Sequence, residues 1–114
     1  MAKSMIPDPL KRRHLVEREL PAEQALAIAE AYLEAGRSEE AVEFLEKAGE
    51  EERLESLARE AVESGDLFLL NEISRVRRRE FDSQDWQRLA ESARRAGKDL
   101  YAEGADRQAK RGDD

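Results

Sequence analysis

Apolar side chains recur every three or four residues along most of the chain, which is the spacing of one face of an α-helix. In three of these stretches the pattern ends at a glycine, namely Gly36, Gly65 and Gly97. Glycine adopts the left-handed backbone that ends a helix without a steric penalty. The pattern therefore predicts a series of amphipathic helices, each closed by a tight turn.

Prolines and short polar residues mark the helix starts, where they tolerate or satisfy the free N–H groups of a first turn. These residues are Asp8 with Pro9, Pro21, Ser38, Asp66 and Asp82. Only a few residues remain for each connection, so consecutive helices are expected to pack as antiparallel hairpins. We expect a last, weaker helix over residues 99–109 with an interruption at Gly104, followed by a flexible tail at residues 110–114.

The helices before the three glycines share one register of large and small residues. Positions eleven and eight before the glycine are mostly large, and positions seven and four before it are mostly alanine. In chain order these positions are Ala25, Ile28, Ala29 and Tyr32; Leu54, Leu57, Ala58 and Ala61; and Trp86, Leu89, Ala90 and Ala93. Large residues fill the space between helices, and alanine lets two backbones approach. The register predicts that Trp86 is wedged between packed helices.

This register resembles the tetratricopeptide repeat (TPR) family, a helix-turn-helix unit of about 34 residues. The first repeat matches it through Ile28, Ala29, Tyr32, Gly36, Ala41, Leu45 and Ala48. The second repeat departs from it at Leu70, Ser74 and Arg77, and the third at Asp106. The resemblance implies an all-α chain: an N-terminal segment with one helix (residues 1–20), then an α-α superhelix, a TPR-like solenoid of about three hairpins (residues 21–109). A HEAT-like stack and a compact bundle of six or seven helices are the alternatives.

Composition is consistent with one small helical domain. The 114 residues include 39% hydrophobic and 41% charged side chains, and alanine, leucine, glutamate and arginine favour helix over sheet. The chain contains no cysteine, which excludes a disulfide framework, a thiolate zinc site and a cysteine nucleophile. No apolar run is long enough to be a signal peptide or to span a bilayer. We therefore expect a cytoplasmic protein without a membrane partner.

The net charge of −7 is concentrated in the middle of the chain. Residues 21–66 carry fourteen acidic and four basic side chains, whereas residues 1–20 have a net charge of +2 and residues 67–114 one of +1. A protein that coats nucleic acid is expected to be basic overall. The largest basic cluster consists of Arg75, Arg77, Arg78 and Arg79, and a smaller one spans Lys11 to Arg13. We expect these arginines to complement a helix C-terminus and to pair with Glu72 or Glu80, and contact with phosphates is the alternative.

Catalytic chemistry has little support in the sequence. His14 is the only histidine, and Glu17 is the only metal-ligating side chain at a suitable spacing from it. The six glycines are scattered singly, so there is no glycine-rich phosphate loop. The Arg-Gly-Asp triplet at residues 111–113 is interpreted as accidental. We expect no enzymatic activity, no metal and no cofactor.

In the resembled family, the first helix of each repeat lines a concave groove that holds a peptide. Carried onto this chain, the groove positions on the first two repeats are Glu23, Leu26, Glu30, Leu33 and Glu34, then Glu52, Glu55, Arg59, Val62 and Glu63. The third repeat adds Gln84, Gln87, Glu91, Arg94 and Arg95. Acidic residues with apolar footholds predict an adaptor that binds a basic or amphipathic segment of a partner protein. A nucleic-acid-associated protein and a self-associating scaffold, such as a homodimer, are the other two interpretations.

Overall fold

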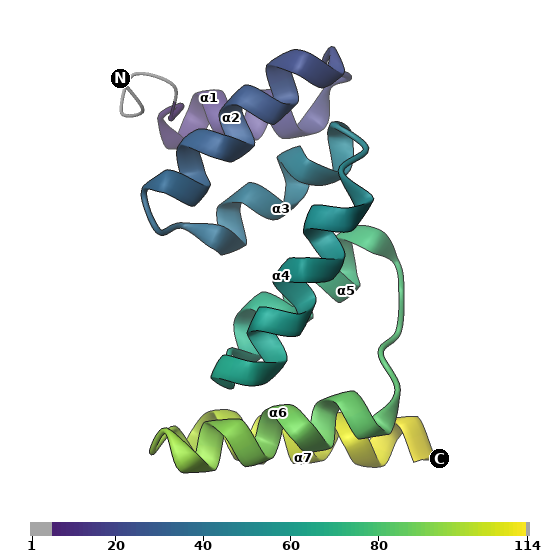
Figure 1. Cartoon of the computed structure of the whole chain (residues 1–114). Coiled ribbons are helices and arrows are strands. Elements are labelled where there is room, and N and C mark those ends of the chain that lie inside the picture. The colour runs from purple at the N-terminus through teal and green to yellow at the C-terminus, as the bar shows by residue number, and fades with distance from the viewer. Residues whose placement is uncertain (1–5, 114) are drawn as a thin grey trace. The chain divides into compact units, whose positions relative to one another are not determined.

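The computed structural model describes residues 6–113, and every regular element in that range is an α-helix (Figure 1). The helices are α1 (Pro9–Glu17), α2 (Ala22–Glu34), α3 (Ser38–Lys47), α4 (Glu51–Ser64), α5 (Leu67–Arg77), α6 (Ser83–Arg95) and α7 (Asp99–Asp113). The prediction of an all-α chain is confirmed.

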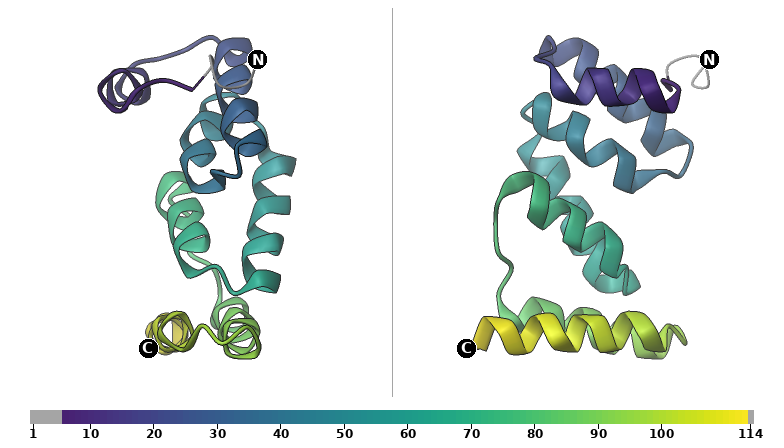
Figure 2. Two further views of the ribbon diagram at one scale, coloured as in Figure 1. Left: turned by 90° about the vertical axis from the view of Figure 1, so that its left-hand side faces the viewer. Right: turned by 180° about the vertical axis from the view of Figure 1, so that it is seen from behind.

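The chain divides after Leu54 into two compact units, so that α4 begins in the first unit and continues in the second. In the first unit α2 packs against α3, and in the second α6 packs against α7 while α7 also meets α5. Each of the first two pairs is an antiparallel hairpin (Figure 2). The division falls inside the range 21–109 that the sequence assigns to one repeat domain.

The aligned register of large and small residues faces the interior in all three helices. Each of its twelve members is buried, and the least buried of them, Leu57, is 7% exposed. The indole of Trp86 is 4% exposed and meets the Phe81 ring edge to face, with the ring centroids 6.3 Å apart. The burial predicted for Trp86 is confirmed.

The three predicted glycine stops, and Gly49 with them, have φ between +71° and +75°. Gly65 has a second reason to lack a side chain, because a Cβ atom there would lie 2.6 Å from the backbone N and Cα of Ala93. No atom lies within 4 Å of the Cβ position at Gly36 or Gly97. The Gly65 turn is therefore also the place where the α4–α5 connection touches α6.

The last helix differs from the prediction at two points. α7 is continuous through Gly104 and extends to Asp113, so residues 110–113 are helical where the sequence predicts a tail. Gly104 is buried, and a Cβ atom there would lie 2.6 Å from Cδ2 of Leu67. This glycine lets α5 and α7 approach each other instead of interrupting the helix. The triplet at residues 111–113 lies on this last turn, and the structure does not describe the side chain of its Asp113.

Side chains cap three of the helices as the sequence predicts. Asp8 accepts a hydrogen bond from the backbone N–H of Lys11 at 2.9 Å. Asp66 and Asp82 accept equivalent bonds, at 3.1 and 3.0 Å, from the residues three positions further on. The prediction that Ser38 is a cap is wrong: Ser38 is the first residue of α3, and Arg37 precedes it without a capping side-chain bond.

Candidate functional site

The groove residues expected on the first repeat lie on α2, in the first unit. Glu23, Glu30 and Glu34 are exposed, and Leu26 and Leu33 are half-buried. The solvent face of α2 is therefore acidic with partly accessible leucines, and its role as the wall of a groove stays a prediction.

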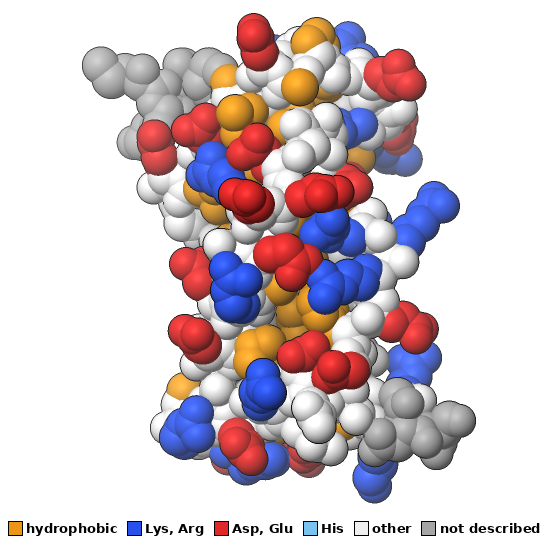
Figure 3. All heavy atoms as spheres, turned by 45° about the vertical axis from the view of Figure 1, so that its right-hand side comes forward, with side chains coloured by type: hydrophobic (Ala, Val, Ile, Leu, Met, Phe, Trp, Pro, Cys, Tyr) orange, Lys and Arg blue, Asp and Glu red, His pale blue; other side chains and the backbone are white. Residues whose placement is uncertain are grey.

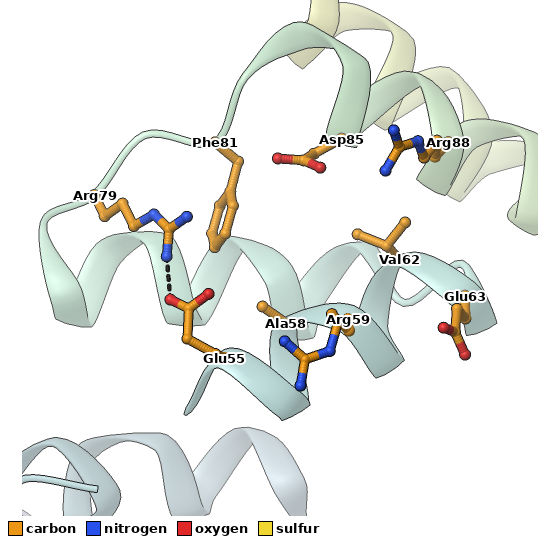
Figure 4. Close-up of a pocket in the computed structure, with 9 residues that line it drawn as sticks. All are labelled: Glu55, Ala58, Arg59, Val62, Glu63, Arg79, Phe81, Asp85 and Arg88. Carbon is orange, nitrogen blue, oxygen red and sulfur yellow. Dashed lines mark hydrogen bonds and ion pairs between the residues drawn. The ribbon is translucent and has the colours of Figure 1, made fainter. Parts of the chain in front are cut away.

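The groove residues expected on the second repeat contribute to a cavity of about 300 Å³ in the second unit (Figure 4). Its walls come from α4, from the loop between α5 and α6, and from α6. The lining residues are Glu55, Ala58, Arg59, Val62, Glu63, Arg79, Phe81, Asp85 and Arg88. Four of the five residues expected on this helix thus line one cavity. The fifth, Glu52, is exposed and belongs to the first unit.

The floor of this cavity is apolar, and local chain geometry places its central ring. α5 ends at Arg77, and the next residue, Arg78, has a φ of +52° that turns the chain toward α6. Phe81 then stands immediately before the cap residue Asp82, and Trp86 is the fourth residue of α6. An apolar residue before the cap packs on the fourth helical residue in many helix starts, an arrangement known as a hydrophobic staple. The staple directs Phe81 into the cavity beside Ala58 and Val62 (Figure 4).

The rim of the cavity carries three arginines and three carboxylates. Arg79 forms an ion pair with Glu55, and its guanidinium lies 4.8 Å from the centroid of the Phe81 ring. Three other charged groups of the rim form no ion pair with a described residue; they are Glu63 of α4 and Asp85 and Arg88 of α6. The rim therefore has charges of both signs available to a ligand.

The arginines of the basic cluster are held largely by carboxylates of the chain itself. Arg75 donates hydrogen bonds of 3.0 and 2.7 Å to Glu72, as the sequence predicts. Arg77 pairs with Glu55 at 3.2 Å, and Arg79 pairs with the same carboxylate. Glu55, and not Glu80, is thus the second partner of the cluster.

The groove residues expected on the third repeat lie on α6 but do not line the cavity. Gln84, Gln87 and Glu91 are exposed, Arg94 pairs with Asp106 at 3.0 Å, and Arg95 donates to the Ser92 hydroxyl at 3.3 Å. Asp85 and Arg88 face the cavity instead. The sequence analysis missed these two and Phe81, although the staple before α6 is a signal that could have found Phe81.

The other groups considered in the sequence do not line the cavity. His14 is exposed on α1, in the first unit. Within residues 6–113, no three or more histidine or acidic side chains are grouped so that they could hold a metal ion. None of the helices in this range is both long and apolar enough to cross a membrane.

No protein-family model, curated protein or solved structure matches the chain.

Proposed function

We propose that the chain is a non-enzymatic interaction module of the cytoplasm, and that its α4–α6 cavity binds a segment of a partner protein. The observation that carries this proposal is the cavity itself, which combines an apolar floor with a rim on which Glu63, Asp85 and Arg88 form no ion pair with a described residue. At about 300 Å³ it lies at the lower limit of ligand pockets. It therefore suits one or two anchoring side chains of a protein segment.

The lining residues favour an amphipathic segment over a purely basic one. An apolar side chain of the partner would enter between Ala58, Val62 and Phe81, while its basic groups would meet Glu63 and Asp85. The guanidinium groups of Arg59 and Arg88 would bind acidic groups of the same segment. Figure 3 shows one face of the molecule, on which acidic and basic side chains intermingle and small hydrophobic areas lie among them. A TPR-like stacking of the hairpins is part of this proposal, and the acidic face of α2 would offer the partner a separate contact in the first unit.

The arginine cluster gives less support to a nucleic-acid partner. Arg75, Arg77 and Arg79 already face carboxylates at hydrogen-bonding distance. A phosphate would have to displace Glu72 and Glu55 before it could bind these groups. Steep salt dependence of binding would identify such a contact.

The proposal is tested by affinity capture from the lysate of the source cells with the full-length chain and two variants. Val62→Gln removes the apolar foothold from the cavity without adding charge. Glu60→Gln, on the same helix, changes an exposed residue outside the cavity and is the matched control. We expect a partner that is captured by the native chain and by Glu60→Gln and is lost with Val62→Gln. Equal recovery with all three proteins would remove the cavity from the proposal.

The acidic face of α2 is tested separately with Glu30→Lys combined with Glu34→Lys. If α2 extends the binding surface, this variant recovers less of the same partner and the loss is greater at low salt, because exposed charges are screened over about 8 Å at physiological salt. Unchanged recovery would confine the site to the α4–α6 cavity.

A further inference from the structure

The first unit contains a second site, independent of the cavity, in which an arginine lies against two aromatic rings. The rings of Tyr32 and Phe44 are stacked, with centroids 5.9 Å apart and planes 20° from parallel. The guanidinium of Arg12, from α1, lies 5.6 Å from the first centroid and 5.5 Å from the second. Its Nη2 donates a hydrogen bond of 2.9 Å to the backbone carbonyl of Glu40. Tyr32, Glu40 and Phe44 of the α2–α3 hairpin surround this guanidinium, and we call these three residues the arginine cleft.

Neighbouring charges fix the shape of this cleft. Arg37 donates two hydrogen bonds of 2.6 Å to the Glu40 carboxylate, and its guanidinium lies 5.1 Å from the Tyr32 centroid. The hydrogen bonds from Arg37 lower the pKa of Glu40, so this carboxylate stays ionised. The carboxylate of Glu40 is thus engaged by Arg37, while its backbone carbonyl remains directed at the guanidinium of Arg12.

Little besides Arg12 holds α1 on the hairpin. Leu15 is the one buried residue of this helix, whereas Leu10 is 65% exposed. Lys47 adds a hydrogen bond of 2.7 Å to the carbonyl of Arg18, just after the helix. A single buried leucine contributes about 1.5–3 kcal/mol, so Leu15 and the polar contacts of Arg12 and Lys47 are the main contacts that retain α1.

The cleft is also imperfectly filled by its own arginine. Nε of Arg12 and the hydroxyl of Tyr32 are both buried, and neither has a hydrogen-bond partner among the described residues. Burying a polar group without a partner costs about 1–3 kcal/mol. Arg12 therefore holds α1 less tightly than a fully hydrogen-bonded arginine would, whichever copy supplies the helix.

We propose that the arginine cleft is a recognition site for an arginine-bearing helix. Within one chain, α1 is its tethered and displaceable ligand. The α1 segment of a second copy is the occupant that replaces it. Charge complementarity supports this choice, since residues 1–20 have a net charge of +2 and residues 21–66 one of −10. The tether between α1 and α2 is short, so the attached helix competes at an effective concentration on the order of millimolar. Exchange between copies is therefore expected only in concentrated solution or when the cis contact is weakened.

The test measures binding of a fluorescent peptide of residues 6–20 to full-length chains by anisotropy. Arg12→Ala in the chain vacates the cleft, so we expect this variant to bind the peptide at least about tenfold more tightly than the native chain, whose cleft is occupied. Replacing Arg12 in the peptide by alanine should weaken binding at least about tenfold. The matched control is Arg13→Ala in the peptide, because the Arg13 side chain is 77% exposed and pairs only with Glu17 of its own helix. The control peptide should bind like the native one.

Folding of the Arg12→Ala chain is checked by circular dichroism. If that chain does not fold, Arg12→Lys replaces it, since lysine keeps the charge but loses the planar fork of the guanidinium. Tighter binding that requires Arg12 of the peptide supports the proposal. Binding that is indifferent to Arg12, equal affinity for native and variant chains, or no binding to a folded variant would each overturn it.

Discussion

Replacing Gly65 by alanine is expected to destabilise the second unit far more than the same change at Gly97. Both glycines lie in that unit, and their φ angles are +71° and +75°. The left-handed backbone costs a residue with a Cβ atom about 1–2 kcal/mol. Alanine recovers about 0.4–1 kcal/mol of that through the lower entropy of its unfolded chain. Gly97→Ala should therefore lose about 1 kcal/mol.

The two positions differ in the space around the missing side chain. At Gly65 the new methyl group would lie 2.6 Å from two backbone atoms of Ala93, whereas at Gly97 it would meet nothing within 4 Å. Backbone atoms of a packed helix cannot move aside as a flexible side chain does. Overpacking of this kind adds about 1–3 kcal/mol, so Gly65→Ala should lose about 2–4 kcal/mol in total.

Urea unfolding of both variants, followed by the fluorescence of Trp86, measures this difference. Trp86 is the only tryptophan and lies on α6, the helix that the Gly65 turn contacts at Ala93 and that ends just before Gly97, so it reports the unfolding of the second unit. The denaturant slope should remain unchanged, which permits comparison of the two free energies. Equal losses for Gly65→Ala and Gly97→Ala would show that backbone conformation alone requires glycine and would refute the close approach to Ala93.

Three further predictions, which use four substitutions, test the local geometry. Arg78→Gly should stabilise the chain by about 1 kcal/mol in thermal unfolding, because Arg78 has a φ of +52° without being glycine; a loss of stability would mean that its side chain outweighs the strain. Asp82→Ala should cost about 1 kcal/mol and Ser38→Ala less than about 0.5 kcal/mol, because only Asp82 caps its helix; equal effects would contradict this assignment. Burial raises the pKa of Tyr32 above its ordinary value of 10.0. The stability that the buried, protonated tyrosine contributes is therefore complete below pH 10.0 and is lost as pH rises through the raised pKa. Native protein should lose stability in that window and Tyr32→Phe should not, and parallel pH profiles would argue against this burial.

Local features of the fold were predictable because they depend on residues within one or two helical turns. Glycine stops, aspartate caps and the buried register each involve neighbours in the chain, and the structure confirms them at Gly36, Asp66 and Trp86. Ser38 was predicted wrongly because a serine before two glutamates suits either the cap or the first helical position. Arg37 takes the cap position in the structure and binds Glu40 instead.

The candidate site was predictable only in part. The register placed Glu55, Arg59, Val62 and Glu63 on one helix face, and these residues do share a cavity. The opposite wall was not predictable in the same way, because it belongs to another helix and a loop. Which turn of α6 faces α4 depends on how the intervening chain folds, and a one-residue rotation exchanges Gln84 and Gln87 for Asp85 and Arg88.

The sequence by itself determined the number of helices, most of their starts and stops and the buried side of the three aligned helices, since these follow from backbone preferences and apolar periodicity. It did not determine the start at Ser38 or the course of the last helix through Gly104. Tertiary structure alone decided which distant groups meet. Glu55 accepts hydrogen bonds from Arg77 and Arg79, which lie 22 and 24 residues further along the chain. Arg12 donates a hydrogen bond to the backbone carbonyl of Glu40, 28 residues away in the sequence. Those encounters depend on the angles at which helices pack, which are set by the whole set of interior side chains and not by any local run of residues.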